Sequence, residues 1–378
     1  MQLLPVRSSV TNRRIRWQSL DELALEQPHG RCSAQASQRT SRLTAIVPAY
    51  NEAGTIADTI RSLQTQTVPL HEIIVIDDCS TDGTADVARA LGVRVVRPAR
   101  NTGSKAGAQN VALERIRTEY TMAIDADTVL ACDAVEQLLT ELNRPQVAAV
   151  CGSVIPRYVR TLWERGRYIE YLFAFTFYKP IQNFYTKPLI SSGCFSAYRT
   201  DALRAMGGWS TRTLAEDMDL TWSFYQAGYR VRFVPEAVCY PIEPHSFCFM
   251  RRQLRRWSHG FVQNVRLHWR GLLSIPYLRS VVAVAMWDAT MASLAYFLLL
   301  PLLAIFVSPW FLLGYVIDAP ATLVPILSMA TSRREVVRAL VSLPAFWVLR
   351  IVNAISFLEA LWTEVILRRP LRVYEKGH

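Results

Sequence analysis

The chain has 378 residues, of which 51% are hydrophobic, and it carries a formal net charge of +11 at pH 7. This length is enough for one sizeable domain and an additional segment. The positive charge favours a polyanionic partner, and the basic clusters at 251–256, 333–334 and 368–372 lie beside apolar segments, which favours a membrane surface. Because no zinc-finger spacing and no aromatic RNA-binding motif is present, we expect no nucleic-acid partner.

Seven cysteines occur without any CxxC spacing, which argues against a disulfide framework or a zinc site. A reducing cytosol is therefore the expected environment of the catalytic part. Residues 1–41 are rich in Arg, Gln and Ser and contain no apolar run long enough for a signal peptide or a spanning helix. We interpret them as an N-terminal extension.

From residue 43 onward, strand-like and helix-like patterns alternate. The strand-like runs are 43–49, 72–76, 93–96, 120–124 and 147–151, and the helical patterns between them cover 56–63, 84–91 and 110–117. This order predicts an α/β fold with a mostly parallel sheet flanked by helices on both faces. Ligand sites in such sheets lie at the carboxyl ends of the strands, and two of these strands end in paired aspartates.

The composition changes after about residue 270, which predicts a catalytic domain over 42–270 and a C-terminal membrane region over 271–378. The segments 281–307 and 310–330 are apolar and long enough to cross a hydrocarbon core of about 30 Å. A third segment, 339–367, carries Arg350, Asn353, Glu359 and Glu364.

The basic residues predict how these segments are oriented. Two crossings would return the chain to the cytosol at Arg333 and Arg334, in agreement with the positive-inside rule, whereas a third would place Arg368 and Arg369 outside. We therefore expect a two-helix hairpin, with the third segment at the interface or against the hairpin; a spanning third helix is the alternative.

Asp125 and Asp127 follow the predicted strand 120–124. Carboxylates two residues apart on such a turn can both reach a hard cation, Mg²⁺ or Mn²⁺, that leaves ligand positions for phosphate oxygens. The alternative is an ordinary solvated turn, since this tripeptide pattern is common.

The strand 72–76 ends at Asp77 and Asp78, where acidic residues can hydrogen-bond a ribose or a base edge. In the same segment we assign Ser80 and Asp82 to capping of the following helix. Lys105 lies in a glycine-bearing loop before a helical pattern, a place that favours anions. This loop does not match the Walker pattern, and an exposed lysine is the alternative interpretation.

Glu216, Asp217 and Asp219 place three acids within four residues. A general base requires such a carboxylate near an acceptor hydroxyl, and neighbouring acids raise its pKa. The alternative is a first helical turn that favours acids. The segment from Gln253 to Trp257 contains arginine, which pairs with a diphosphate, and tryptophan, which offers a sugar ring an apolar platform; a membrane-interface anchor is the alternative.

Together these motifs resemble the inverting family 2 glycosyltransferases with a GT-A fold, and more closely the cellulose, chitin and hyaluronan synthase branch. The matching segments extend from about residue 44 to 260. In chain order they are Pro48-Ala49-Tyr50-Asn51-Glu52, Asp77-Asp78, 105–110, Asp125-Ala126-Asp127, 192–199, Ala215-Glu216-Asp217 and Gln253 to Trp257.

The resemblance implies a role for each matching position. Tyr50, Glu52 and one of Asp77 or Asp78 should hold the uridine of a UDP-sugar donor. Lys105 should approach the diphosphate, and Asp125 and Asp127 should bind donor phosphate and the metal ion.

For the acceptor side, the resemblance implies that Asp217 is the catalytic base and that the adjacent Glu216 helps to bind the acceptor. Gln253, Arg256 and Trp257 should close over the diphosphate and the acceptor sugar. Attack by the deprotonated hydroxyl would then invert the configuration at the anomeric carbon.

The expected activity is transfer of a hexose or N-acetylhexosamine, with N-acetylglucosamine preferred, from a UDP-sugar to a glycan acceptor through a β-linkage. The expected location is the cell membrane, multi-pass, with a cytoplasmic catalytic domain. This chain shows no spanning segment before the catalytic domain, unlike the polymer synthases, so association of several chains is an option. A single transfer to a membrane lipid and a catalytically inactive membrane scaffold are the alternative functions.

Overall fold

The computed structural model describes residues 42–185, 187–287 and 294–371, and these belong to one compact unit. The predicted N-terminal extension, Cys32 and Arg372 lie outside the described residues. Within the described part, the free cysteines are Cys79, Cys132, Cys151, Cys194, Cys239 and Cys248.

The centre of the fold is a single sheet with the strand order β3-β2-β1-β4-β7-β6-β8-β5. Its strands are β1 (Leu43–Ala49), β2 (Glu72–Asp77), β3 (Arg94–Val96), β4 (Tyr120–Ile124), β5 (Thr128–Leu130), β6 (Val147–Val154), β7 (Phe195–Arg199) and β8 (Arg230–Pro241). The five predicted strands are present, with shifts of a few residues at their ends.

The prediction of a mostly parallel sheet is corrected to a mixed sheet. Strands β1 to β4 pair in parallel, but β7 runs antiparallel to both β4 and β6, and β5 runs antiparallel to β8. The reversal has a structural consequence, because β7 pairs Phe195 with Ile124. The loop that precedes β7 therefore lies at the carboxyl end of β4, beside Asp125.

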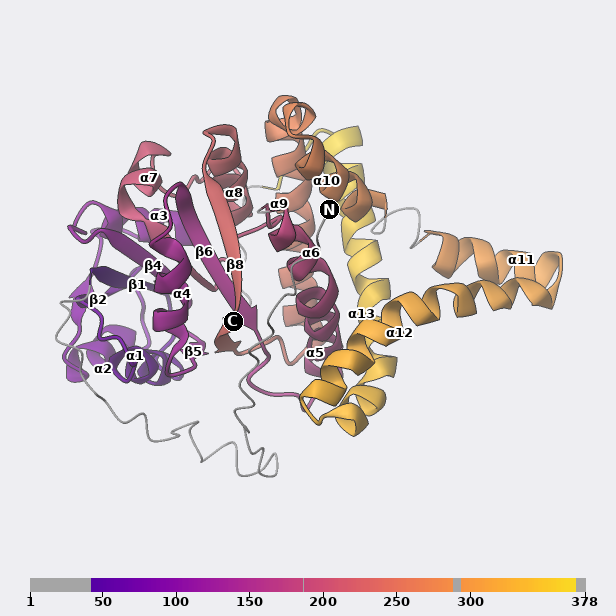
Figure 1. Cartoon of the computed structure of the whole chain (residues 1–378), viewed down its shortest axis with the longest axis horizontal. Coiled ribbons are helices and arrows are strands. Elements are labelled where there is room, and N and C mark those ends of the chain that lie inside the picture. The colour runs from indigo at the N-terminus through magenta and orange to yellow at the C-terminus, as the bar shows by residue number, and fades with distance from the viewer. Residues whose placement is uncertain (1–41, 186, 288–293, 372–378) are drawn as a thin grey trace, which may run out of the picture. The chain divides into compact units, whose positions relative to one another are not determined.

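Helices cover both faces of the sheet (Figure 1). Alternate residues of β1 point to opposite faces, so Ala45 and Val47 join one apolar cluster while Ile46 joins another. The first cluster includes α1 (Ile56–Gln64) and α4 (Ala134–Leu142), with α2 (Thr84–Ala90) at its edge. The second cluster includes α3 (Lys105–Leu113), α7 (Thr200–Ala205) and α8 (Glu216–Gln226).

The remaining helices lie beside the sheet domain or extend away from it, as α11 (Leu300–Phe306) does (Figure 1). The other α-helices of this group are α5 (Leu162–Phe173), α6 (Lys179–Phe184), α9 (Phe247–Ser274), α10 (Pro276–Trp287), α12 (Gly314–Ser332) and α13 (Val336–Leu361). Two π-helical turns, η1 (Ala174–Tyr178) and η5 (Trp362–Ile366), extend α5 and α13. Helix α9 continues through the expected domain boundary at residue 270, so it belongs to both predicted parts.

Helix α13 packs on α5 and α9. Phe346 joins Tyr168 and Ile169 of α5 in one apolar cluster, and Leu349 joins Met250 and Leu254 of α9 in another. The two acids of the segment 339–367 face α9: Glu359 pairs with Arg255 at 3.1 Å, and Glu364 pairs with His259 at 2.9 Å.

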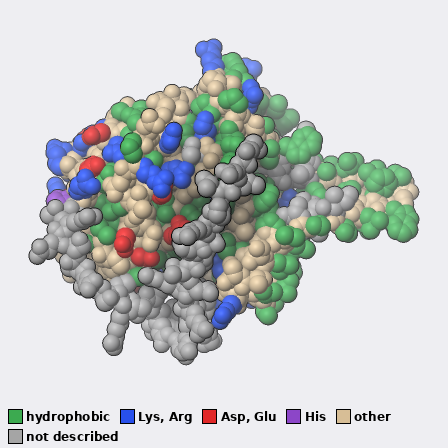
Figure 2. Space-filling view, in the orientation of Figure 1, with side chains coloured by type: hydrophobic (Ala, Val, Ile, Leu, Met, Phe, Trp, Pro, Cys, Tyr) green, Lys and Arg blue, Asp and Glu red, His purple; other side chains and the backbone are tan. Residues whose placement is uncertain are grey.

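Among the described residues, one helix, Val336–Ile366, is long and apolar enough to cross a membrane by length and composition. The predicted pair 281–307 and 310–330 stays a prediction, and its first member includes residues 288–293, which the structure does not describe. Hydrophobic side chains cover the region of α11 and α12 in the space-filling view (Figure 2). Ile305 and Phe306 of α11 and Trp310, which lies between the two helices, are exposed.

Candidate active site

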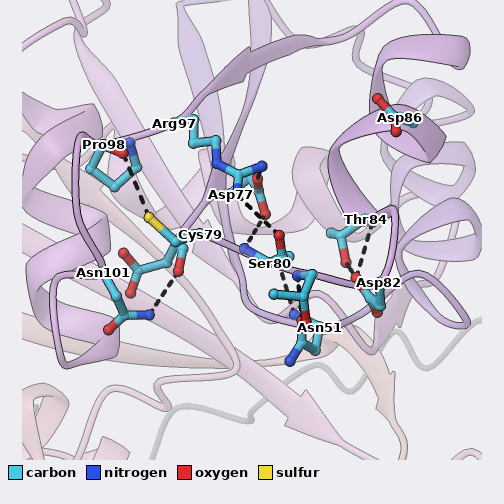
Figure 3. Close-up of polar contacts among 12 residues, drawn as sticks. Asn51, Asp77, Cys79, Ser80, Asp82, Thr84, Asp86, Arg97, Pro98 and Asn101 are labelled. Atoms are coloured by element: carbon cyan, nitrogen blue, oxygen red, sulfur yellow. Dashed lines mark hydrogen bonds and ion pairs between the residues drawn. The ribbon is translucent and has the colours of Figure 1, made fainter.

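The loops after β1 and β2 are joined by hydrogen bonds, as Figure 3 shows. The backbone N–H of Asn51 donates to the Ser80 hydroxyl at 2.9 Å, and the backbone N–H of Thr81 donates to the side-chain Oδ1 of Asn51 at 2.9 Å. Asn51 adopts φ 56, in the left-handed region that Asn tolerates well. This turn places Tyr50, which is exposed, and Glu52, which is buried, at the carboxyl end of β1.

The N-cap of α2 is Gly83, which corrects the capping predicted for Ser80 and Asp82; of these two residues, Asp82 contacts the first residue of the helix. Asp82 Oδ1 accepts the Thr84 N–H at 3.1 Å at the start of α2. Ser80 has a different function, because its hydroxyl binds Asn51 and its N–H donates to Asp77 Oδ1 at 3.1 Å. Ser80 therefore joins the two loops.

Asp77 and Asp78, which the sequence could not separate, have different surroundings. Asp77 has no exposed surface and forms an ion pair with Arg97 at 3.1 Å (Figure 3). Asp78 accepts the Thr102 N–H at 2.8 Å and the Thr102 hydroxyl at 2.9 Å. Asp78 therefore stabilises the loop that leads to Lys105, whereas Asp77 is buried and paired with Arg97.

Lys105 and Asp217 meet at Gly193. The Lys105 ammonium donates to the Gly193 carbonyl at 2.7 Å and forms a close ion pair with Asp125. The Gly193 N–H donates to Asp217 Oδ2 at 2.8 Å. A Cβ at position 193 would lie 2.7 Å from that oxygen, so the close approach requires glycine. Residues from β4, α3, α8 and the loop before β7 thus converge at one point.

Lys105 itself is the first residue of α3, although the helical pattern predicted a start near residue 110. The Ser104 hydroxyl accepts the Gly107 N–H at 3.1 Å and caps the helix. Its preference for this position explains the earlier start.

Asp125 and Asp127 follow β4 as predicted, within a concentration of negative charge. Burial, followed by the charges of Asp125 and Glu52, raises the pKa of Asp127 to about 8. The carboxylates of Asp125 and Asp127 offer hard oxygen ligands. A divalent cation there would offset the repulsion between these negative charges, so the residues fit Mg²⁺ or Mn²⁺. Within the described ranges no group of three or more His, Cys, Asp and Glu side chains is arranged to hold a metal ion. Donor phosphates and water would have to supply the remaining ligands.

The three acids at the start of α8 differ sharply. Burial and the charge of Glu216 raise the pKa of Asp217 to about 6, against the lowering effect of Lys105. Asp219 accepts two hydrogen bonds from Arg212, at 2.7 and 2.8 Å, and one from His268 at 2.6 Å. These partners outweigh its burial and lower its pKa to about 2. Asp217 thus combines a raised pKa with a direct contact to Gly193, two properties that suit a general base.

Gln253, Arg256 and Trp257 lie on α9, which begins after β8. Trp257 is 39% exposed, and the Arg167 guanidinium lies 4.4 Å from its ring centroid. Gln253 Oε1 is buried and has no hydrogen-bond partner among the described residues. One face of the Trp257 ring is thus supported by a fixed cation.

Sequence reasoning missed the residues that hold this cation. Arg167 is buried and donates to Glu243 at 3.1 Å and to the Tyr171 hydroxyl at 2.9 Å. Glu243 also adds to the negative charge around Asp127. No spacing pattern links residues 167 and 243, because they meet only through the packing of α5 against the end of β8.

Known proteins are similar to this chain in sequence and in fold. Residues 44–207 match the family model for glycosyl transferase family 2. The poly-beta-1,6-N-acetyl-D-glucosamine synthase of Staphylococcus epidermidis is 28% identical over 228 residues, 59% of this chain and 55% of that protein. The synthase of the same name from Staphylococcus aureus strain MSSA476 is 27% identical over 222 residues, 58% of this chain and 54% of that protein.

The chain spans about half the length of the curated relatives it matches. Among solved structures, the mannosyltransferase PcManGT from Pyrobaculum calidifontis, in complex with GDP-Man and Mn²⁺, shares the fold with a TM-score of 0.53 and 23% identity. The match covers 80% of this chain and 87% of that one. Residues 44–207 are thus similar to glycosyltransferase family 2, and the curated relatives are similar to this chain over 58–59% of its length.

Proposed function

We propose that this chain transfers N-acetylglucosamine from a UDP-sugar to a hydroxyl of a glycan acceptor, with inversion and formation of a β-linkage. The observation that carries the proposal is the junction at Gly193, where the Asp217 carboxylate and the Lys105–Asp125 pair meet. A base and a diphosphate site must be this close if one acceptor oxygen is to attack a sugar as its diphosphate departs.

In the proposed reaction, Asp217 takes the proton of the acceptor hydroxyl. That oxygen attacks the anomeric carbon from the side opposite the diphosphate, the bond to the diphosphate oxygen breaks, and UDP leaves with the bonding electrons. The Lys105 ammonium is placed to stabilise the negative charge that develops on the diphosphate. A divalent cation held by Asp125 and Asp127 would supply further neutralisation of that charge.

The positions of the remaining residues support a donor subsite and an acceptor subsite. Tyr50, Glu52 and Asp78 lie at the joined loops after β1 and β2, which suits the uridine. Trp257 offers its exposed ring as a platform for the acceptor sugar, and Arg167 fixes the orientation of the ring.

The choice of sugar and acceptor rests on the relatives. Those reported above are named poly-beta-1,6-N-acetyl-D-glucosamine synthases, which supports N-acetylglucosamine as the donor sugar and a glycan as the acceptor. The length of the labelled product tests this part, because a polymer supports a glycan acceptor and a single transfer to lipid contradicts it.

We also propose that α13 anchors the chain in the cell membrane. Its apolar side chains that do not pack on α5 and α9 are exposed, including Val337, Val341 and Ile355. Its acids Glu359 and Glu364 are paired with α9 and so add no unpaired charge to that surface.

The decisive experiment measures UDP release from a set of UDP-sugars by the full chain in membranes or detergent. We expect Asp217→Asn to retain donor binding and to lose turnover by a factor on the order of 10² or more, as for a lost general base. Asp201→Asn is the matched control, because Asp201 is an exposed acid in the first turn of α7. Equal turnover of Asp217→Asn and wild type would remove Asp217 from this role.

Chelation provides a second test. We expect EDTA to abolish UDP release and added Mg²⁺ or Mn²⁺ to restore it, because Asp125 and Asp127 need a cation to accept a diphosphate. Turnover that persists in EDTA would contradict the metal assignment while leaving the role of Asp217 open to the first test.

A further inference from the structure

Helix α9 touches the segment that leads into the proposed base. A Cβ at Gly260 would lie 2.7 Å from the Ala215 side chain and 2.8 Å from its backbone nitrogen, so the approach requires glycine. The Asn264 amide donates to the Ala215 carbonyl at 3.0 Å and to the Thr213 hydroxyl at 3.3 Å. Because Ala215 is the N-cap of α8, α9 fixes the backbone two residues before Asp217.

An adjacent face of α9 holds the end of the apolar helix. Glu364 of η5 is fully buried, and its Oε1 interacts with His259 Nδ1 at 2.9 Å and accepts the Leu371 N–H at 3.0 Å. Arg266 donates to the Glu364 carbonyl at 2.6 Å. A buried carboxylate with several donors has a strongly preferred position, because moving it away leaves an uncompensated charge.

Gln263 is hydrogen-bonded both to the segment before Asp217 and to the C-terminal end of the apolar helix. Its Oε1 accepts the Leu214 N–H at 3.0 Å, and its Nε2 donates to Glu364 Oε1 at 2.7 Å and to the Leu371 carbonyl at 3.0 Å. The orientation of the amide is fixed by chemistry, since Leu214 offers a donor while Glu364 and Leu371 offer acceptors at these atoms. One side chain thus connects the C-terminal end of the apolar helix to the segment before Asp217.

We propose that Gln263 is a positioning residue for Asp217. Glu364 holds Gln263 in place, so the packing of the apolar helix on α9 determines where the Asp217 carboxylate lies. This inference rests on the proposed function. Gln263 touches neither Asp217 nor the Lys105–Asp125 pair in any described contact, so its effect is on geometry and not on chemistry.

The test compares Gln263→Leu, Gln263→Glu and the double variant Gln263→Glu with Glu364→Gln. The first removes all three hydrogen bonds. The second keeps the acceptor for Leu214 but places a carboxylate against Glu364. The double variant restores one donor and one acceptor across the contact. Arg270→Gln is the control, because Arg270 is an exposed residue of the same helix.

We expect both single variants to lower kcat by a factor on the order of 10, the cost of a slightly displaced catalytic group, with the donor KM within about twofold of wild type. The double variant should recover a large part of kcat. Hydrogen exchange at the Gly193 amide, which donates to Asp217, should be faster in the single variants and slower again in the double variant. Exchange in the loops after β1 and β2 should not change.

Unchanged kcat and unchanged Gly193 exchange in both single variants would overturn the inference. So would a loss of kcat that follows the loss of thermal stability and does not recover in the double variant, since that result indicates packing alone. If wild-type protein releases no UDP from any donor, the proposed function fails separately, and the Gly193 exchange still decides whether Gln263 positions Asp217.

Discussion

Glu216, Asp217 and Asp219 occupy one turn of α8, and their surroundings give three carboxylates three different properties. Asp219 is neutralised by Arg212 and His268, Glu216 is buried beside its neighbour, and Asp217 alone faces Gly193 and Lys105. Glu216 was predicted to bind the acceptor, but its side chain is buried and has little exposed surface for such a contact. The charge of Glu216 instead raises the pKa of Asp217.

The pH profile of turnover follows from this arrangement. A base must be deprotonated, and since the pKa of Asp217 is raised to about 6, kcat should fall as the pH falls through about 6. Glu216→Gln removes a charge that raises this pKa, so its acidic limb should move to lower pH. The measurement is kcat against pH, with Asp201→Asn as a control that shifts nothing; a limb that stays in place would contradict the coupling.

Gly193→Ala tests the close approach directly. The new Cβ would lie 2.7 Å from Asp217 Oδ2, so the carboxylate must move away from the Gly193 N–H. We expect kcat to fall by a factor on the order of 10 or more, because a small displacement of a catalytic group is costly. Gly54→Ala is the control, since nothing lies within 4 Å of its added Cβ. A Gly193→Ala enzyme with wild-type kcat would show that the junction tolerates a side chain.

At the scale of elements, the reversal of β7 decides where the site forms. The run 195–199 belongs to a recognised motif, but its direction depends on which strand it pairs with, and that pairing is set by residues far away in the chain. Only the antiparallel pairing with β4 brings the 192–194 loop to Asp125. Periodicity located five strands, and the strands β5, β7 and β8 are not among those predicted.

Strands β6 and β8 approach each other closely at Gly152. A Cβ there would lie 2.2 Å from the Ala237 carbonyl oxygen and 2.7 Å from Phe195 Cε1. We therefore expect Gly152→Ala to destabilise the fold by about 1–3 kcal/mol, the typical cost of overpacking a core. Thermal unfolding of the detergent-solubilised protein measures this effect, and a melting temperature equal to that of wild type would contradict the close packing.

At the scale of the whole molecule, α13 is shared between the sheet domain and the proposed membrane. Its residues Leu349 and Phe357 pack on α9 while Val341 and Ile355 are exposed. The positive-inside argument favoured the first two segments as the hairpin and left 339–367 beside it. Among the described residues, the helix that includes this third segment, Val336–Ile366, is long and apolar enough to cross a membrane, and the hairpin of the first two segments stays a prediction.

Ile351→Arg tests the membrane role of α13, because Ile351 is exposed and lies at the middle of the helix Val336–Ile366. An arginine at the centre of a spanning helix costs about 2.5–3.5 kcal/mol on insertion scales, so a smaller fraction of the chain should sediment with membranes after alkaline extraction. Ala90→Arg, at an exposed position in α2 on the sheet domain, is the control with the same added charge. Equal membrane fractions for the two variants would argue against a spanning α13.

The sequence by itself determined the elements whose signal is local. The alternation of apolar residues located β1 to β4, and the acids at their ends marked the carboxyl edge where the site lies, because these patterns depend on neighbours within a few residues. It also determined the order of motifs that resembles family 2 glycosyltransferases.

The tertiary structure decided everything that depends on contacts between distant segments. It separated Asp77 from Asp78 through Arg97 and Thr102, joined Asp217 to Lys105 through Gly193, and brought Arg167 to Trp257. The pKa of a carboxylate and the direction of a strand are set by atoms that are close in space but far apart in the chain, and no local pattern records them.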